Sequence, residues 1–224
     1  MADNNPKISI NKLGEYLEAN PSRRRRIVFD QKNPVAFITT RYNKAREIAV
    51  EYFSSNFDEE IILGGIEDID RDKNSTDFQA NDNQKSMEYL ERLLDIDLPN
   101  FDNLTISKYI GDNPKVNLNG LEVSVNPDLI VRGILRGKKV VGAIKLHISQ
   151  SNSLNDESAK NVATILHLFV EQFIAEDDEL ADIRLCYSID IFSETIESAP
   201  RSFFRRRNYI SDACLEIIMW WNNL

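Results

Sequence analysis

The sequence contains few of the residues that build zinc centres and disulfides. It has two histidines and two cysteines among 224 residues, and none of the four lies at the spacing of a common zinc site. Cys186 and Cys214 both fall within apolar stretches, so we expect two reduced, buried thiols. His167 falls on the apolar face of a predicted helix, which favours a place in the core.

Long apolar runs and phosphate-binding loops are also missing. The sequence has no run of about eighteen apolar residues that could span a membrane, and the start Met1–Lys7 is too polar for a secretion signal. Gly64-Gly65 is not followed by the Lys-Ser or Lys-Thr of a phosphate-binding loop, and no nucleophile elbow occurs. We therefore expect a cytoplasmic protein in a reducing compartment, with no membrane partner.

The chain has enough apolar sequence for one substantial core. Hydrophobic residues make up 42% of it, and no linker rich in proline, glycine or serine divides it. We predict a single α/β domain over residues 1–224, with a mixed central sheet and flanking helices. Its expected parts are a helical N-terminal part (1–57), a polar acidic loop (58–84) and an α/β core (104–224).

Helix signals dominate before the core. Ser9 is a plausible N-cap, and Asn20-Pro21 is typical of a helix start. Helices are predicted over Ile10–Ala19, Pro21–Gln31, Thr40–Ser54 and Gln84–Asp95, and a strand over Leu104–Ile110.

The stretch from Leu121 to Ser149 has the alternation of a β-meander. Its strands are predicted over 121–126, 129–135 and 139–148, with a turn at Gly137. Asp128 then enters one strand and Lys145 lies in the next, so their side chains can meet. Small and apolar neighbours surround Lys145, and a buried ammonium must be paired or functional because an unpaired one costs several kcal/mol.

Regular elements continue to the C-terminus. A helix is predicted over Ala159–Ala175, a strand over Ile183–Phe192 and a closing helix over Asn208–Asn222. The predicted order is therefore three strands, a helix, a strand and a helix.

Pro127-Asp128 and Ala143-Ile144-Lys145 together resemble the core motif of the PD-(D/E)xK, or restriction-endonuclease-like, nuclease superfamily. In that family an aspartate is followed, after a spacer, by an acidic residue, any residue and a lysine, and an upstream helix adds a glutamate. Ala143 stands where the acid is expected. The resemblance covers 104–224 and implies that the strand after the helix returns parallel to the lysine strand by a right-handed crossover.

The resemblance also implies a Mg²⁺ or Mn²⁺ site. Phosphodiester hydrolysis at such an ion needs carboxylate ligands, and a cation to stabilise the developing charge. Asp128 would bind the metal, and Lys145 would polarise the attacking water or stabilise that charge. For the helical glutamate, Glu51 is preferred to Glu47 because it lies nearer the apolar face of its helix.

The carboxylate missing at Ala143 has several possible replacements. Glu122 on the preceding strand is one, Asp190 on the later strand is another, and an upstream helix is a third source. The catalytic set predicted by resemblance is therefore Asp128, Lys145 and Glu51, with Asp128, Glu51 and Glu122 as metal ligands. If none of these carboxylates reaches Asp128, the site is inactive and the fold serves as a binding module.

Two arginine clusters, 23–26 and Arg201 with 205–207, contrast with the net charge of −9. Basic patches can follow a phosphate backbone locally, while the acidic remainder repels non-specific binding. The family often places a polar or basic residue of the crossover helix near the phosphate, for which Lys160, Asn161 and Thr164 are candidates. The predicted nucleic-acid contacts are Arg24, Arg25, Lys160, Arg205 and Arg206; solvated helix ends paired with acids are the alternative.

Three functions fit these observations. The resemblance implies a metal-dependent phosphodiesterase acting on DNA, in defence, repair or mobile-element biology. Ala143 favours a catalytically inactive nuclease-like module that binds nucleic acid or protein. The acidic composition and the Trp220-Trp221 end favour a protein-interaction subunit or homo-oligomer without nucleic acid.

Overall fold

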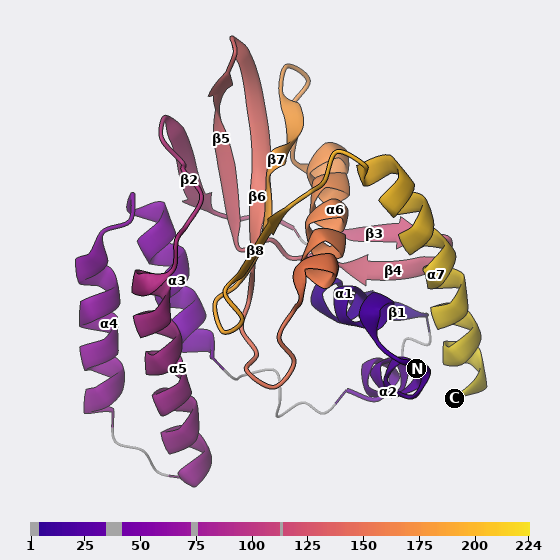
Figure 1. The fold of residues 1–224 in the computed structure, drawn as a ribbon, viewed down its shortest axis with the longest axis horizontal. Coiled ribbons are helices and arrows are strands. Elements are labelled where there is room, and N and C mark those ends of the chain that lie inside the picture. Colours follow the sequence, from indigo (N-terminus) through magenta and orange to yellow (C-terminus); the bar gives the residue numbers. More distant parts are fainter. Residues whose placement is uncertain (1–4, 35–41, 73–75, 113) are drawn as a thin grey trace.

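The computed structural model describes residues 5–34, 42–72, 76–112 and 114–224. They form a mixed α/β fold in which helices flank β-sheet on both sides (Figure 1). This confirms the predicted fold class, including the helical N-terminal region.

Helices and strands come in runs along the chain. The helices are α1 (Ile10–Glu18), α2 (Pro21–Lys32), α3 (Asn43–Ser54), α4 (Glu59–Arg71), α5 (Asp77–Asp95), α6 (Asp156–Phe173) and α7 (Phe203–Asn223). The strands are β1 (Lys7–Ser9), β2 (Leu104–Lys108), β3 (Lys115–Leu118), β4 (Leu121–Ser124), β5 (Leu129–Leu135), β6 (Lys138–His147), β7 (Leu180–Asp190) and β8 (Thr195–Ser198). After the short first strand, α1 to α5 follow one another, and β2 to β6 come next.

The larger sheet has the strand order β2-β5-β6-β7-β8. Strands β5 and β6 form an antiparallel hairpin in which Leu129 faces Ile144. The chain then passes through α6 and returns as β7, which runs parallel to β6. The predicted hairpin and the parallel return are both confirmed.

The first strand of the predicted meander, 121–126, does not join this sheet. Strand β4 lies between β1 and β3 in a smaller sheet, and the neighbour of β5 on the side away from β6 is β2. Asn126 has a φ of 45° and Pro127 follows it. A left-handed residue before a proline, which has no N–H to donate, breaks the strand and lets the chain change sheets. The meander prediction is therefore wrong in its first strand.

The predicted acidic loop 58–84 is also wrong, because most of it is helical. Asp58 caps α4 by accepting a hydrogen bond from the Glu60 N–H, and acidic residues in a first turn interact favourably with the helix dipole. Ile62 and Ile69 are buried along one side of α4. Helix α5 starts at Asp77, seven residues before the predicted Gln84. The predicted start of the third helix, Thr40, lies outside the described residues.

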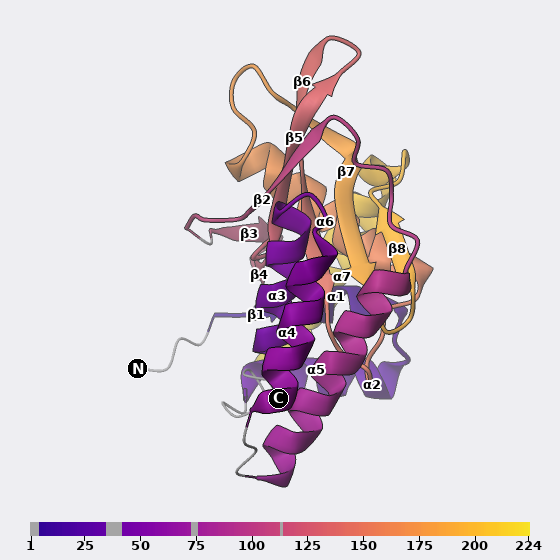
Figure 2. The same ribbon diagram turned by 90° about the vertical axis from the view of Figure 1, so that its left-hand side faces the viewer.

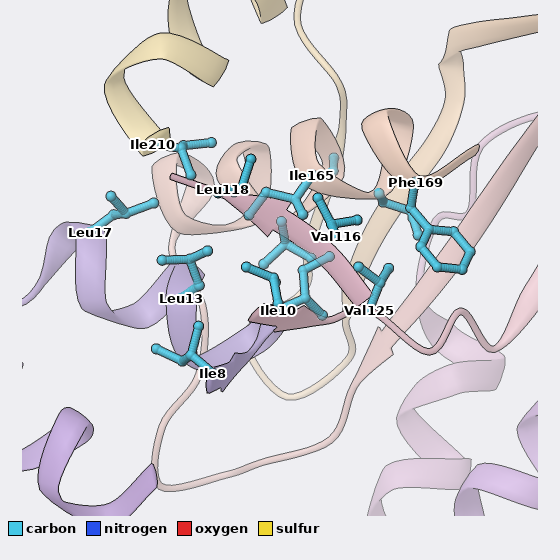
Figure 3. Close-up of a cluster of buried hydrophobic side chains, with 14 of the residues drawn as sticks. Ile8, Ile10, Leu13, Leu17, Val116, Leu118, Val125, Ile165, Phe169 and Ile210 are labelled. Carbon is cyan, nitrogen blue, oxygen red and sulfur yellow. The ribbon is translucent and has the colours of Figure 1, made fainter. Parts of the chain in front are cut away.

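Two apolar clusters fill the two faces of the larger sheet. Because side chains alternate along a strand, Val141 and Ala143 of β6 face the cluster with α6, whereas Ile144 and Leu146 face the cluster with α3 and α5. Figure 3 shows the first cluster where the smaller sheet packs against α1 and α6. Both clusters thus share the central strands.

Both cysteines lie in these packed regions. Cys186 and Cys214 are free and buried, and burial raises the pKa of each thiol to about 12. The prediction that both cysteines are core residues is confirmed. His167 is buried as well, and its ring packs edge-on to Phe203.

Candidate functional site

Asp128 and Lys145 meet at one end of the larger sheet. The hairpin register continues past Leu129, because the Asp128 N–H donates to the Ile144 carbonyl. Lys145 Nζ lies 3.1 Å from Asp128 Oδ2, and the two side chains are only 11% and 7% exposed. The contact predicted from the strand pattern is therefore confirmed.

A third residue, Arg46 of α3, completes this cluster. Its Nη1 donates to Asp128 Oδ1 at 2.5 Å and to the Leu146 carbonyl at 3.2 Å. Sequence reasoning missed Arg46, although it lies next to Ala45 and one turn before Ala49, both buried. That position at the margin of an apolar face was the available signal.

The Asp128 carboxylate is held on both oxygens. Oδ1 accepts from Arg46, while Oδ2 accepts from the Leu146 N–H at 2.7 Å and faces Lys145. Lys145 Nζ also donates to the Asn126 carbonyl at 2.6 Å. We call Asp128, Lys145 and Arg46 the ion triad.

Burial and charge compete in the ion triad. Burial alone would raise the pKa of Asp128, but the charges of Lys145 and Arg46 and the Leu146 N–H hold that pKa below its ordinary value. For Lys145, burial lowers the pKa, and the neighbouring Arg46 charge adds to the effect while Asp128 opposes it. Burial also acts to lower the pKa of Arg46, but the attraction of Asp128 exceeds it and the pKa is raised.

These residues do not fit a divalent metal ion. Mg²⁺ binds hard oxygen ligands in a near-octahedral shell, yet Asp128 faces two cations that would repel it. Within residues 5–34, 42–72, 76–112 and 114–224, no group of three His, Cys, Asp or Glu side chains is arranged to hold a metal. The predicted ligands are therefore not brought together. Glu51 is exposed on α3 in a groove with α4, and Glu122 lies in the smaller sheet opposite Asn117.

The surroundings of Ala143 explain why no acid can stand there. Ala143 is fully buried, pairs with Ile130 on one side and Cys186 on the other, and belongs to the apolar cluster facing α6. A carboxylate at this position would be desolvated, and neither of these neighbours could pair with it.

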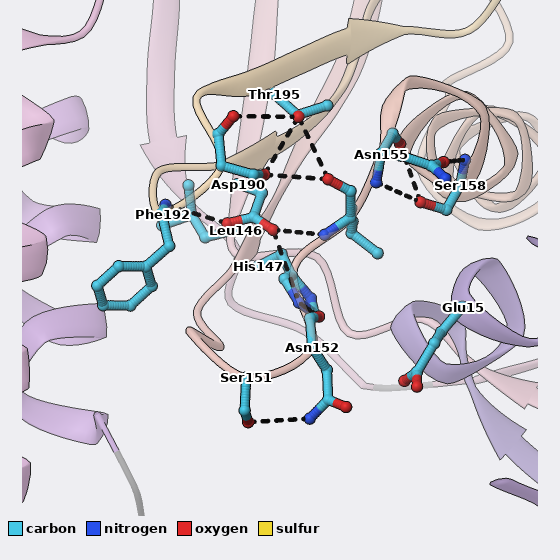
Figure 4. Close-up of polar contacts among 12 residues, drawn as sticks. Glu15, Leu146, His147, Ser151, Asn152, Asn155, Ser158, Asp190, Phe192 and Thr195 are labelled. Carbon is cyan, nitrogen blue, oxygen red and sulfur yellow. Dashed lines mark hydrogen bonds and ion pairs between the residues drawn. The ribbon is translucent and has the colours of Figure 1, made fainter. Parts of the chain in front are cut away.

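Asp190, the other candidate ligand, is occupied by backbone groups. Its Oδ2 accepts from the Leu154 N–H at 2.7 Å and its Oδ1 from the Phe192 N–H at 3.1 Å (Figure 4). His147 Nε2 lies 3.8 Å from Oδ2 and makes a hydrogen bond with the Asn152 carbonyl at 2.8 Å. Asp190 therefore fastens the loop between β6 and α6 to the end of β7.

Several of the predicted nucleic-acid contacts are taken up within the molecule. Arg24 donates to the Tyr16 and Leu17 carbonyls and pairs with Glu216. Arg206 donates to Asn161 Oδ1 and pairs with Glu157. Lys160 pairs with the same Glu157 and with Glu197.

The remaining two predicted contacts are exposed. Arg25 lies over the Trp220 ring, and Arg205 lines a hollow at the start of α7. The first arginine cluster packs near Glu216 and Trp220, whereas the second lies about ten residues earlier on α7, or roughly 15 Å along the helix. The two clusters therefore do not meet in one patch.

The site thus combines one ionised carboxylate with two cations at one end of the larger sheet, and these groups pair with one another. No helix in the described parts of the chain is long and apolar enough to cross a membrane. Neither a protein-family model nor a curated protein matches this sequence.

Proposed function

We propose that this protein is a catalytically silent, nuclease-like module that acts by binding a partner. The observation that carries the proposal is the ion triad. Arg46 and Lys145 form ion pairs with Asp128, the carboxylate that would otherwise bind a metal. Ala143 in a dry core and the distant placement of Glu51 and Glu122 support it further.

The nuclease-like part of the proposal rests on strand order. An antiparallel hairpin carries Asp128 and Lys145 at facing positions, and α6 then leads into a parallel strand. This agrees with what the resemblance to the PD-(D/E)xK superfamily implies for its core.

A metal-dependent nuclease acting on DNA is the second candidate, and the direct contact between Asp128 and Lys145 favours it. For that activity Arg46 would have to leave Asp128, and a further carboxylate would have to approach. We therefore rank it below the silent module.

The partner is proposed to be a protein. The chain carries a net charge of −9, and phosphate backbones are bound chiefly by unpaired lysine and arginine. Arg24, Arg206 and Lys160 are instead paired with acidic side chains.

Cleavage and metal binding test the silence of the site. Purified protein is incubated with single- and double-stranded DNA and RNA in millimolar Mg²⁺ or Mn²⁺, beside the variants Asp128→Ala and Lys145→Ala. We expect no cleavage, and no rise in melting temperature on adding either ion, because an ion that bound the folded state would stabilise it.

The opposite result has a clear form. Cleavage by the wild type that both variants abolish would identify a working nuclease. Binding of the same nucleic acids at physiological salt, weakened by Arg25→Ala with Arg205→Ala, would replace the protein partner with nucleic acid.

A further inference from the structure

Helices α3 and α4 enclose a groove on the side of the molecule away from α1, α2 and α7. The two helices are joined by a short connection and pack side by side, and Figure 2 views them from this side. The groove between them has a volume of about 490 Å³. It is separate from the ion triad, of whose members none lines it.

The groove has an apolar floor and an acidic rim. Its floor is formed by the buried or half-buried Ile48, Ile61, Gly65 and Ile69, and the exposed Gly64 lies beside them in the lining. Its rim is formed by Glu47, Glu51, Glu60, Asp68 and Asp72, with Lys44 as the one cation among the lining residues.

Part of this negative charge has no counter-ion among the residues that the structure describes. Lys44 pairs with Asp72, and the exposed Arg71 pairs with Asp68. Among the described residues, Glu47, Glu51 and Glu60 make no ion pair. The groove therefore presents carboxylates to a cationic ligand.

The adjacent Gly64 and Gly65 in the middle of α4 differ in how closely other residues approach them. A Cβ at Gly65 would lie 2.7 Å from Ile48 Cδ1, so the close packing of α3 on α4 accounts for that glycine. A Cβ at Gly64 would meet nothing within 4 Å. Glycine inside a helix is unfavourable relative to alanine. No contact among the described residues accounts for Gly64, which lines the groove.

We infer that this groove binds an amphipathic, lysine- or arginine-rich helix of a partner protein, whose backbone passes closely over Gly64. Apolar side chains of that helix would cover the floor, and its cations would face the rim, in the mode of a helix laid into a groove. Along α4 the lining residues run from Glu60 to Asp72, about 18 Å, which matches roughly three helical turns.

This inference rests on the proposal that the protein acts by binding another protein, but not on the silence of the Asp128 site. Cleavage or metal binding at the Asp128 site would therefore leave the inference about the groove untouched. A groove that binds no peptide would likewise leave the proposal for the Asp128 site untouched.

A synthetic peptide probes the groove directly. A fluorescein-labelled amphipathic helix of leucine, alanine and lysine is titrated with the full-length protein, and anisotropy gives the Kd; a peptide with glutamate in place of lysine is the charge control. We expect the lysine peptide alone to bind, with Gly64→Leu weakening it at least tenfold although no charge changes.

Matched variants separate the groove from general acidity. Glu47→Gln with Glu51→Gln and Glu60→Gln is compared with Glu91→Gln, Asp95→Asn and Asp97→Asn, a second set of exposed carboxylates. The groove set should weaken binding about tenfold, and the second set less than twofold. Gly64→Ala should raise the melting temperature of the protein while weakening its binding of the peptide. A folding defect cannot produce both effects.

Three outcomes would overturn the inference. An unchanged Kd of the peptide for Gly64→Leu would place binding elsewhere. Equal losses of peptide affinity from the two carboxylate sets would mean that the peptide is held by non-specific charge attraction. A wild-type dimer in sedimentation velocity that Gly64→Leu converts to monomer would make a second copy of this chain the occupant.

Discussion

Asp128 is the residue on which the candidate site depends. It is a buried carboxylate with two cations beside it. Among the described residues neither cation has a comparable alternative, because Lys145 otherwise donates only to the Asn126 carbonyl and Arg46 only to the Leu146 carbonyl. Breaking a buried ion cluster by removing one partner is costly, because the charges left behind stay desolvated.

Asp128→Asn is therefore expected to lower the free energy of unfolding by about 3 kcal/mol at neutral pH, the lower end for buried pairs because Arg46 is one-third exposed. Urea denaturation followed by circular dichroism measures this. Asp178→Asn, which breaks an exposed pair with Lys139, should leave the urea midpoint almost unchanged.

The same variant has a defined pH dependence. The pKa of Asp128 is lowered in the folded state, so its stabilising charge is fully present above the ordinary aspartate pKa of about 4 and is lost as pH falls through the lower folded value. The stability gap between wild type and Asp128→Asn should be widest at neutral pH and shrink below about pH 4. A gap that is constant down to pH 2 would mean that the cost of Asp128→Asn is steric.

At the scale of elements, we expect the close pairing of β6 and β7 to be sensitive to substitution. Their register shifts between Val141 and Ala143, and the intervening Gly142 lies directly against the backbone of Leu185. A side chain there would overlap the Leu185 carbonyl group, which is part of β7 and cannot rotate away.

Gly142→Ala is expected to cost about 3 kcal/mol or more, at the upper end of overpacking costs. Gly137→Ala provides a contrast, because a Cβ at Gly137 meets nothing within 4 Å and only its φ of 76° is unfavourable. Melting temperatures of the two variants should differ clearly, and similar values would show that β7 shifts to accommodate the methyl group.

Elements with a capping residue, or with an apolar periodicity that extends over many residues, could be predicted from the sequence. Ser9 caps α1 by accepting from the Lys12 N–H, as its position before the apolar pattern predicted. Strands β1, β3 and β8 were missed because three or four residues are too few for an alternating pattern. Helix α4 was missed because its many exposed acids have the composition of a loop.

The site was half predictable for a related reason. Asp128 and Lys145 belong to one hairpin, so local register alone brings them together. Arg46 arrives from α3, and its approach depends on how that helix packs against the sheet, which no local pattern encodes. Glu51 and Glu122 were placed by analogy, and neither packs against Asp128.

At the scale of the whole molecule, the two apolar clusters are coupled through shared strands. Strands β5, β6 and β7 contribute alternate residues to both clusters, so neither cluster retains its sheet face if the other unfolds. Tryptophan fluorescence reports on the cluster facing α6, since Trp220 and Trp221 lie in or against it.

We therefore expect one cooperative unfolding transition. The urea curves from tryptophan fluorescence and from far-ultraviolet circular dichroism should coincide. A fluorescence transition at clearly lower urea than the circular dichroism transition would divide the chain into separately unfolding parts. Helices α3, α4 and α5 would then remain folded at urea concentrations that unfold α7.

The ion triad also restricts how this sequence can change over evolutionary time. Losing Asp128 leaves two cations without their carboxylate, and losing Lys145 or Arg46 takes one partner from a buried carboxylate. Exchanging all three for apolar residues of similar volume is instead often close to neutral. Intermediate sequences are therefore less stable than either end state. Descendants of this chain should keep the arginine on α3 together with the strand pair, or carry none of the three.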